Sequence, residues 1–377
     1  MNVLALNCGS ATVKFRLVAV EPGAAAADGR ALAQGTETVH GDDYAGAIGG
    51  ALAAARAAGA VEAVGHRVVH GGAHFVSPTR VDDELIAALK ELITLAPLHN
   101  RPSVAGIQAC RDALGDATPM VAVFDTAFHA RLPAAAMTYA IPTELAARHG
   151  IRRFGFHGIS YAWATVRAAA LLGRRVDDLK LVALHLGSGC SAAAIRGGVS
   201  VETSMGLTPL EGLVMRTRSG DVDPALSSLL ARVAGATPAE VERWLNHDSG
   251  LRGLAGGDGD VRDLLAREPS DARARLALDV FCHRARKYLG AYLAVLEGAD
   301  AVVFTAGIGE HAPEIRRRIA AGFEWCGLAL DPRRNVATLG RDGVIGTDGA
   351  TMQALVVAAD EERQIAAETA ACLTGAH

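Results

Sequence analysis

A short polar stretch follows the first apolar run of the chain and contains residue types that bind phosphate. Residues 7–14, with the sequence NCGSATVK, combine a glycine, two hydroxyl side chains and a lysine. Glycine lets backbone N–H groups approach phosphate oxygens closely, and the hydroxyl and ammonium groups add donors and positive charge. A hairpin turn explains the glycine alone equally well, but glycine-rich turns also follow two later apolar runs, at residues 187–189 and 307–309. Three such turns together indicate a site for phosphate groups.

Two common sequence motifs of nucleotide-binding proteins are absent. The chain has no G-x-x-x-x-G-K-[ST] sequence, and no G-x-G-x-x-G opens a strand–helix–strand unit. The sequence therefore disfavours a P-loop enzyme and a Rossmann dehydrogenase, and the phosphate site must be built another way.

Two arginines and an aspartate could act on an anionic substrate. Arg67 and Arg218 lie in the polar, glycine-containing stretches 66–72 and 205–221. Two guanidinium groups can clamp a carboxylate and a phosphoryl group together, although either arginine alone would equally suit a surface ion pair. Asp125 follows an apolar run, at a strand end where Mg²⁺ ligands often lie; a helix cap is the alternative.

Apolar runs and helical spacing predict the elements that position these residues. Short apolar or alternating runs predict strands, and apolar residues at helical spacing predict helices. Strands are predicted at residues 3–6, 13–20, 64–69, 120–124, 191–196, 199–203, 301–304 and 355–358. Helices are predicted at 83–95 and 276–296, with two more ending near residue 320 and at the C-terminus. Strands that alternate with helices predict an α/β fold.

The strand and turn at the N-terminus recur near the middle of the chain. Residues 181–188 align with residues 3–10 without a gap, so that a glycine falls on a glycine and a serine on a serine. Each copy is followed by a further predicted strand. The repeat favours a duplicated domain, and because no low-complexity linker separates the halves, we expect a hinge between them.

The composition excludes several functional classes. The chain has 377 residues, half of them hydrophobic, and a net charge of −4, with no basic run of five residues. We therefore expect about two domains and no nucleic-acid surface. The basic run 316–318 is interpreted as a solvated helix face. The chain shows no signal-peptide pattern, no apolar span of ~20 residues and no C-x-x-C pair among its six cysteines, which predicts a cytoplasmic protein with no membrane association.

Taken together, these motifs resemble the acetate and propionate kinase family, within the actin-like sugar-kinase and heat-shock superfamily. The strings NCGSATVKF, GHRVVHGG, APLHNRPS, VFDTAFH, RRFGFHGISY, HLGSGCS, MGLTPLEGL, TRSGDVDP and FTAGIGE follow the family's order and spacing over nearly the whole chain. The resemblance implies a duplicated actin-like (ribonuclease H-like) fold of two domains with an active-site cleft between them. Residues 1–128 and about 364–377 would form the N-terminal domain, and residues 129–363 the C-terminal domain that carries the nucleotide site.

The resemblance also implies the reaction and its catalytic residues. The reaction would be reversible, Mg²⁺-dependent phosphoryl transfer from ATP to acetate, giving acetyl phosphate and ADP, with Mn²⁺ as an alternative ion. Arg67 and Arg218 would hold the substrate carboxylate and the transferred phosphoryl group. His157 would stabilise the transition state, and Asp125 would position Mg²⁺ and the second arginine. The family further implies a homodimer.

Further ligand contacts are implied by the same resemblance. Asn7 and Glu361 would lie at the metal, and His99 near the site. The methyl pocket would be formed by Val69, Leu98, Phe156 and Pro209. The nucleotide would be bound by Ser10, Thr12, Lys14, His185, Gly187, Ser188, Gly189, Asp260, Val261, Arg262, Gly307, Ile308, Gly309 and His311.

Three residues depart from the family pattern: Ser188, Arg216 and His311. All three map near the nucleotide, so the phosphoryl donor is the open question. The side chain of Arg216 could fill part of the adenosine pocket. Alternatively, it could swing outward and pair with a nucleotide phosphate or with an acid such as Asp221. The alternatives are a pyrophosphate-dependent acetate kinase, a propionate or butyrate kinase, and, from another class, an inactive nucleotide-binding sensor.

Overall fold

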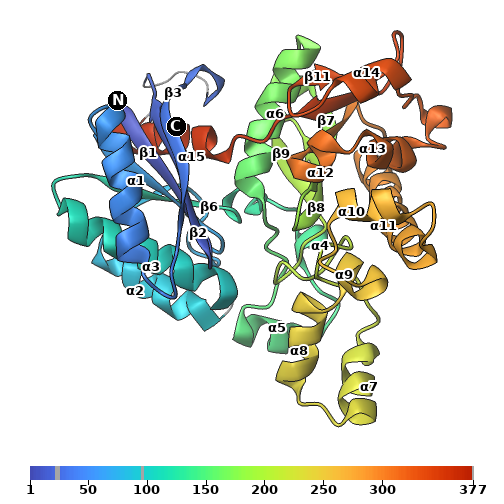
Figure 1. Cartoon of the computed structure of the whole chain (residues 1–377), viewed down its shortest axis with the longest axis horizontal. Helices are drawn as coiled ribbons and strands as arrows, with labels where there is room; N and C mark the ends of the chain where they lie inside the picture. The colour runs from blue at the N-terminus through green and yellow to red at the C-terminus, as the bar shows by residue number, and fades with distance from the viewer. Residues whose placement is uncertain (22–25, 95–96, 376–377) are drawn as a thin grey trace. The chain divides into compact units, whose positions relative to one another are not determined.

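A continuous apolar run near the N-terminus forms a central strand in the first of two mixed sheets (Figure 1). The computed structural model describes residues 1–21, 26–94 and 97–375. Within these residues the chain forms two compact units. The first consists of Met1–Ala130, Phe156–Trp163 and Asp360–His377, and the second of Arg131–Gly155 and Ala164–Ala359.

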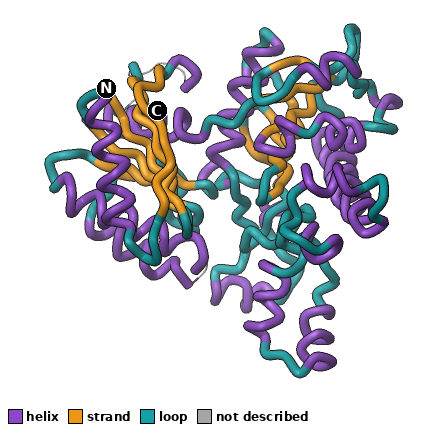
Figure 2. The backbone as a smooth tube through the Cα atoms, in the orientation of Figure 1, coloured by secondary structure: helices purple, strands orange, loops and turns teal. Residues whose placement is uncertain are grey.

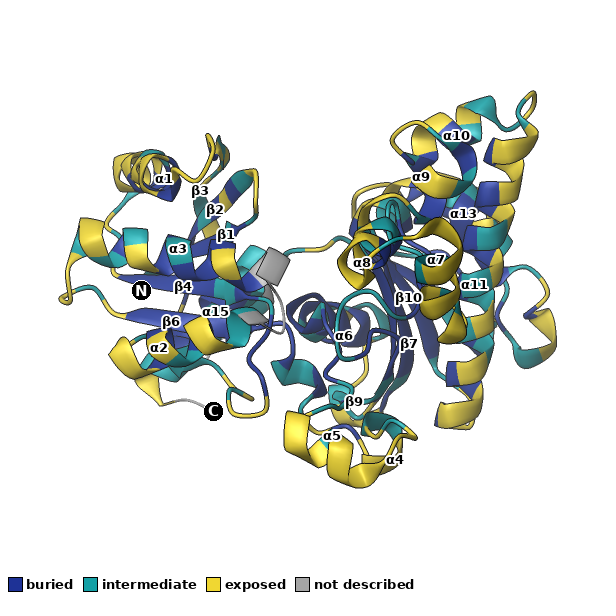
Figure 3. Ribbon diagram, turned by 90° about the horizontal axis from the view of Figure 1, so that it is seen from below, coloured by how far each residue is buried: buried dark blue, intermediate teal, exposed yellow. Residues whose placement is uncertain are grey.

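The first unit contains a sheet covered by helices on both faces. Its strands are β1 (Asn2–Cys8), β2 (Thr12–Ala19), β3 (Arg30–Thr38), β4 (Ala63–Val68), β5 (Thr79–Arg80) and β6 (Met120–Phe124). Its helices are α1 (Tyr44–Ala58), α2 (Asp83–Glu91), α3 (Pro97–Leu114) and α15 (Glu361–Thr374), with 3₁₀ turns at Ala26–Asp28, Leu92–Thr94 and Ala127–His129. Leu4 and Leu6 of β1 pack with α1, whereas Val3 and Ala5 pack with α15 on the other face. Figure 3 shows the buried β4 and β6 beside helices with exposed outer surfaces.

The second unit contains the other sheet. Its strands are β7 (Lys180–Leu186), β8 (Cys190–Arg196), β9 (Val199–Thr203), β10 (Ala301–Thr305), β11 (Gly343–Val344) and β12 (Gln353–Val357). Its helices are α4 (Ala134–Met137), α5 (Thr143–His149), α7 (Ala225–Ala234), α8 (Pro238–His247), α9 (Gly250–Ala255), α10 (Val261–Arg267), α11 (Ala272–Leu296), α12 (Ala306–His311), α13 (Pro313–Ala320) and α14 (Pro332–Ala337), with 3₁₀ turns at Val176–Asp178 and Glu324–Cys326. Helix α6 (Gly158–Leu172) begins in the first unit and continues in the second. The long helix α11 packs on β7 and β8.

The two sheets have the same topology, which confirms the predicted duplication. The order β3-β2-β1-β4-β6-β5 in the first corresponds to β9-β8-β7-β10-β12-β11 in the second. In each sheet three strands form an antiparallel meander, two further strands run parallel to its first strand, and a short antiparallel strand lies at the edge. Figure 2 shows both sheets in orange with their flanking helices. The fold is the duplicated actin-like α/β fold that the sequence predicts.

Some element boundaries differ from the prediction. Strand β1 continues to Cys8, so the first turn is shorter than predicted, and the helix expected at 83–95 ends at Glu91, before a 3₁₀ turn. Residue 95 lies outside the described residues. The glycine-rich segment 307–309 was predicted as a turn but belongs to helix α12. Ala306, with φ 63°, turns the chain from β10 directly into this helix. In the described residues no helix is long and apolar enough to cross a membrane.

The prediction that the run 316–318 is a solvated helix face is wrong for Arg316, which is completely buried. Its guanidinium donates hydrogen bonds to the carbonyls of Gly309 and Glu310, at the end of α12, and to those of Asn335 and Thr338 around the end of α14. The last carbonyls of a helix lack partners within it, so one buried cation satisfies two helix ends. Burial lowers the pKa of Arg316 to about 10, so it stays charged at neutral pH.

Replacing Arg316 with methionine should destabilise the protein strongly, because each buried carbonyl left unpaired costs about 1–3 kcal/mol. We expect the free energy of unfolding, measured by urea denaturation, to fall by about 3 kcal/mol or more. The neighbouring Arg317 forms an exposed ion pair with Glu314, so Arg317→Met should change it by about 1 kcal/mol or less. Equal stability of the two variants would contradict the assigned role of Arg316.

Candidate functional site

An ion pair between a buried aspartate and a partly buried arginine lies at the carboxyl ends of the parallel strands of the first unit. Arg67, near the end of β4, donates from Nη2 to Oδ2 of Asp125 at 2.6 Å and from Nε to Oδ1 at 3.1 Å. Asp125 directly follows β6, which pairs with β4. Asn7 of β1 accepts from Nη1 of Arg67 at 3.1 Å, and Glu361, the first residue of α15, lies 4.0 Å from the same nitrogen. Parallel pairing thus brings Asn7, Arg67 and Asp125 together, and the start of α15 adds Glu361.

The charges of this cluster are suited to a divalent cation. Burial disfavours the charged form of Arg67, but the charges of Asp125 and Glu361 and the hydrogen bond to Asp125 outweigh it and raise its pKa above the ordinary value. One guanidinium therefore faces two carboxylates and the amide oxygen of Asn7. The described residues contain no group of three or more His, Cys, Asp or Glu that could enclose a metal. Mg²⁺ commonly uses only one or two carboxylates, and takes its other ligands from water and substrate phosphates, so this donor set fits it.

His157 is held beside the same aspartate by an unusual backbone conformation. It has φ 58°, in the left-handed region that non-glycine residues rarely occupy. The next residue, Gly158, donates its N–H to the carbonyl of Asp125 at 2.9 Å. A Cβ at position 158 would lie 2.2 Å from that oxygen, so only glycine allows this approach. The strained turn therefore fixes His157 close to Asp125.

Buried polar groups that the sequence analysis did not select support this turn. Nε2 of His129 donates to the carbonyl of Phe156 at 3.0 Å, and burial lowers the pKa of His129 to about 4. Asn100 exchanges two hydrogen bonds with the backbone of His70, whose ring contacts Phe156 edge to face. His129 lies in the string VFDTAFH and Asn100 in the string APLHNRPS, and both strings carry the family resemblance. Their place in these strings is the signal by which the sequence could have pointed to them.

Arg218, in the second unit, is a partly buried cation that no carboxylate of the described residues pairs with. Its Nη1 donates to the carbonyl of Pro209 at 3.1 Å and lies 3.5 Å from the sulfur of Met215. Among the described residues it has no carboxylate partner, and burial lowers its pKa. Arginine nevertheless stays protonated in proteins. A desolvated guanidinium with unused donors is suited to bind an anion.

The loops around Arg218 are tied together by side chains that the sequence analysis missed. Tyr288 donates to Oδ2 of Asp221 at 2.6 Å, and Oδ1 of Asp221 accepts from the backbone of Gly212 at 2.9 Å. Arg153 pairs with Glu211 and donates to the carbonyls of residues 203–205. These contacts join residues 205–212 to 217–221, and so restrict the position of Arg218.

A cavity of about 270 Å³ in the second unit collects most of the predicted nucleotide residues. Its lining is Gly187, Ser188, Arg216, Gly259, Asp260, Val261, Arg262, Gly307, Ile308, His311 and Ala312. The turn after β7, the start of α10 and the glycine-rich helix α12 form its walls. Hydrogen bonds that Arg262 donates to the carboxylate of Asp260 lower the pKa of Asp260 to about 2, so Asp260 is ionised at neutral pH.

Arg216 lies at this cavity but pairs with an acid that was not predicted. Its Nη2 lies 2.7 Å from Oδ2 of Asp258, and its Nε donates to the carbonyl of Asp258 at 2.9 Å. Asp221, the acid named in the sequence analysis, instead accepts from Tyr288. The side chain is thus drawn to the 256–260 loop, as in the outward position considered above.

Other predicted residues do not line this cavity. Ser10, Thr12 and Lys14 belong to the first unit, and His185, Gly189 and Gly309 are absent from the cavity wall. Of the predicted methyl pocket, Phe156 is buried and Val69 partly buried in the first unit, while Pro209 lies in the second. Leu98 and His99 fall outside the residues whose side chains the structure describes.

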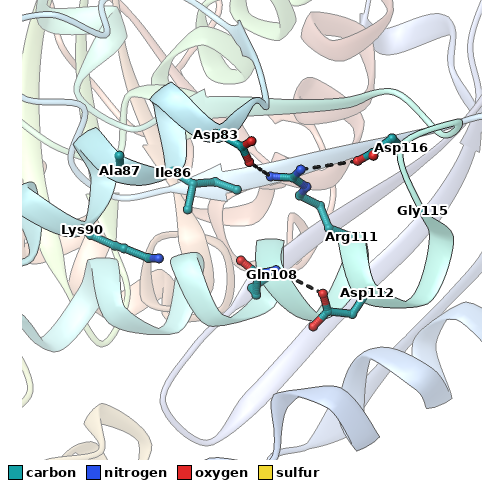
Figure 4. A pocket seen from close by; sticks show the side chains of 9 residues that line it. All are labelled: Asp83, Ile86, Ala87, Lys90, Gln108, Arg111, Asp112, Gly115 and Asp116. Atoms are coloured by element: carbon teal, nitrogen blue, oxygen red, sulfur yellow. Dashed lines mark hydrogen bonds and ion pairs between the residues drawn. The ribbon is translucent and has the colours of Figure 1, made fainter.

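A second hollow, of about 460 Å³, lies between α2 and α3 and contains no predicted site residue (Figure 4). Its arginine, Arg111, is neutralised by Asp83 at 2.7 Å and by Asp116 at 3.3 Å. Both carboxylates are almost fully exposed to solvent. This hollow is a solvated surface feature, and it supplies matched control residues for tests of the buried site.

Comparisons with known proteins identify the relatives of the chain. The Acetokinase family profile matches residues 2–367. The acetate kinase of Solibacter usitatus is 46% identical over 409 aligned positions, which cover 100% of this chain and 99% of the relative. The acetate kinase of Clavibacter michiganensis is 51% identical over 83% of this chain and 79% of its own length. Among solved structures, Porphyromonas gingivalis acetate kinase has a TM-score of 0.90 at 34% identity, covering 99% of both chains. A propionate kinase from Francisella tularensis has a TM-score of 0.87, also at 34% identity, covering 98% of both.

The close approach at Gly158 predicts that Gly158→Ala damages the turn that holds His157. The added Cβ meets backbone atoms of Asp125, which cannot move as a flexible side chain would. We expect the free energy of unfolding to fall by about 2 kcal/mol or more in urea denaturation. Gly290, within α11, has room for a Cβ, so Gly290→Ala should be neutral or stabilising by up to ~1 kcal/mol. A Gly158→Ala protein as stable as wild type would disprove the crowding.

Proposed function

Because the chain belongs to the Acetokinase family, we propose that it catalyses Mg²⁺-dependent, reversible transfer of the terminal phosphoryl group of ATP to acetate, giving acetyl phosphate and ADP. The observation that carries this proposal is the cluster of Asn7, Arg67, Asp125 and Glu361, with its single cation, two carboxylates and amide oxygen. It offers a carboxylate-binding guanidinium next to ligands for a divalent ion.

The reaction needs little acid–base chemistry from the protein. Acetate is ionised at neutral pH, so its oxygen can attack without a general base. That oxygen forms a new bond to the terminal phosphorus, and the bond from phosphorus to the bridging oxygen breaks with its electrons remaining on ADP. The obstacle is the approach of one anion to another, and positive groups around the transferred phosphoryl group lower that barrier.

The residues of the chain supply this positive environment. We assign Arg67 to the acetate carboxylate and Arg218, which has no acid partner in the described residues, to the oxygens of the transferred phosphoryl group. His157 would donate a hydrogen bond to the same group. Asp125 would position Mg²⁺ and would orient Arg67, with which it pairs, where the family resemblance named the second arginine. When bound, Mg²⁺ would neutralise phosphate charge, held by Asn7 and Glu361.

The acceptor and the donor each have an alternative. The Francisella relative titled a propionate kinase favours an acceptor range that includes propionate, and one extra methylene in an apolar pocket changes binding by only ~1–3 kcal/mol. A pyrophosphate donor would be favoured if Arg216 filled the nucleoside cavity. Arg216 instead pairs with Asp258, and a cavity lies beside this ion pair. This arrangement supports ATP as the donor. The presence of Arg67, Asp125, His157 and Arg218 together argues against an inactive sensor.

Three properties complete the proposal. We propose a homodimer, because the family resemblance implies one, and a cytoplasmic protein, because its six cysteines are all free thiols. We also propose that residues 1–128 with about 364–377, and residues 129–363, act as the two functional domains. Sedimentation of the purified chain tests the dimer directly.

The purified protein should form acetyl phosphate from acetate and ATP, detected as hydroxamate after trapping with hydroxylamine. We expect activity with acetate and propionate, weak activity with acids of five or more carbons, and far better use of ATP than of pyrophosphate. Excess chelator should abolish turnover, and added Mg²⁺ or Mn²⁺ should restore it. Preference for pyrophosphate in wild type, with ATP use gained in Arg216→Gly, would overturn the donor assignment, and full activity in chelator would overturn the metal assignment.

Removing either proposed catalytic arginine should lower turnover by about 10²–10³-fold, the usual cost of losing a donor that stabilises transition-state charge. The variants are Arg67→Ala and Arg218→Ala, with activity measured at saturating substrates and folding checked by circular dichroism. Arg111→Ala and Arg243→Ala are matched controls, because both arginines form ion pairs away from the site, and they should keep wild-type turnover. A folded Arg67→Ala or Arg218→Ala protein with more than about a third of wild-type activity would refute that residue's role.

A further inference from the structure

Arg216 occupies a position where it can bind the phosphates of the donor, and no comparison assigns it this role. We propose that Arg216 is a phosphate-binding residue of the nucleotide cavity, which selects nucleoside di- and triphosphates over the free nucleoside. The inference rests on the proposed function, since it concerns the same donor site, and it adds a residue that sets donor selectivity.

The backbone places Arg216 beside the turn after β7. Its N–H donates to the carbonyl of Ser188 at 3.1 Å, and its own carbonyl accepts from Arg252 at 2.9 Å. Gly187 and Ser188 line the same cavity as the Arg216 side chain. The turn corresponds, in the repeat, to residues 9 and 10 after β1, and glycine-rich turns of this kind present N–H groups to phosphate oxygens. The backbone of Arg216 is therefore hydrogen-bonded directly to the predicted phosphate turn.

The side chain is anchored and still has donors to spare. Nε donates to the backbone carbonyl of Asp258 and Nη2 to Oδ2 of its carboxylate, whose Oδ1 accepts from the backbone of Asp260 at 2.8 Å. In the described part of the chain Nη1 has no acceptor, so its N–H groups are available to a ligand. An arginine held on one edge by a carboxylate loses less conformational freedom when its remaining donors bind phosphate. Asp258 thus acts as the anchor.

Among the described residues that line the cavity, the other cations are placed less well than Arg216. Arg262 pairs with Asp260 through both Nε and Nη2, and its side chain is 88% exposed. His311 lies 3.9 Å from the carboxylate of Glu310 and carries charge only when protonated. Arg216 is 37% exposed and lies at the turn itself. The backbone of Arg216 is bonded to Ser188 of that turn, so a polyphosphate bound there would lie beside the residue that carries this guanidinium.

The test is calorimetric binding of adenosine, AMP and ADP to wild type and to Arg216→Gln. Glutamine keeps a polar, hydrogen-bonding side chain, although a shorter one, and removes the charge. We expect ADP to bind about fivefold more weakly to the variant, a modest loss because the ion pair is partly exposed, and adenosine to change by less than about twofold. Added salt should weaken ADP binding more in wild type than in the variant. The matched control is Arg243→Gln, which removes an exposed arginine–aspartate pair outside the cavity and should change nothing.

Three results would overturn the inference. Equal loss of adenosine and ADP affinity would mean that Arg216 only braces the 256–260 loop. Tighter adenosine binding in the variant would mean that the side chain obstructs the cavity. Unchanged ADP binding, in a protein that still makes acetyl phosphate, would remove the role of Arg216 and leave the proposed function intact. Failure of wild type to bind any of the three ligands, without acetyl phosphate formation, would reject the proposed function itself.

Discussion

The pairing of Arg67 with Asp125 links two neighbouring parallel strands at the edge where they end. A guanidinium is costly to bury alone, and a carboxylate on the next strand offsets that cost only if the strands keep their register. Because β4 pairs with both β1 and β6, the same register brings Asn7 to the guanidinium. The backbone of Asp125 then accepts from Gly158, so the turn that carries His157 depends on it as well. A single ion pair therefore orders the anion site of the first unit.

The two arginines assigned to the reaction are stabilised in opposite ways. Arg67 is surrounded by acids that raise its pKa, whereas Arg218 is buried against a carbonyl and a sulfur, and its pKa is lowered. Arg67 is suited to a site that must also attract a metal ion, because the carboxylates around it remain negatively charged. Arg218 retains more of its field for an incoming phosphoryl group, since no carboxylate in the described part of the chain neutralises it. The two arginines do not occupy equivalent places of the repeat: Arg67 lies in β4, whereas Arg218 lies in the segment between β9 and α7.

The sheets and their duplication could be predicted because alternating or continuous apolar residues are a local signal, and residues 3–10 and 181–188 are short matching copies. The cluster around Arg67 could be predicted only by resemblance, since nothing local joins Asn7 to Glu361. The burial of Arg316 could not be read from its neighbours, because a run of three arginines looks alike whether one of them faces helix ends or solvent. Asp258 was missed for the same reason: the partner of Arg216 is set by how the 256–260 loop folds back. The helical conformation of segment 307–309 was hidden by its glycines, which are more typical of turns.

The short strands at the sheet edges have a consequence for how the chain avoids self-association. Strands β5 and β11 contain only two residues each, Thr79–Arg80 and Gly343–Val344, and each pairs antiparallel with the last parallel strand of its sheet. Parallel β6 and β12 are apolar, and an uncovered edge on either would offer a long row of free N–H and C=O groups to another chain. A two-residue strand removes much of that row and exposes too few groups itself to support a new ladder. The duplicated fold thus carries two small barriers against the edge-to-edge aggregation to which parallel sheets are prone.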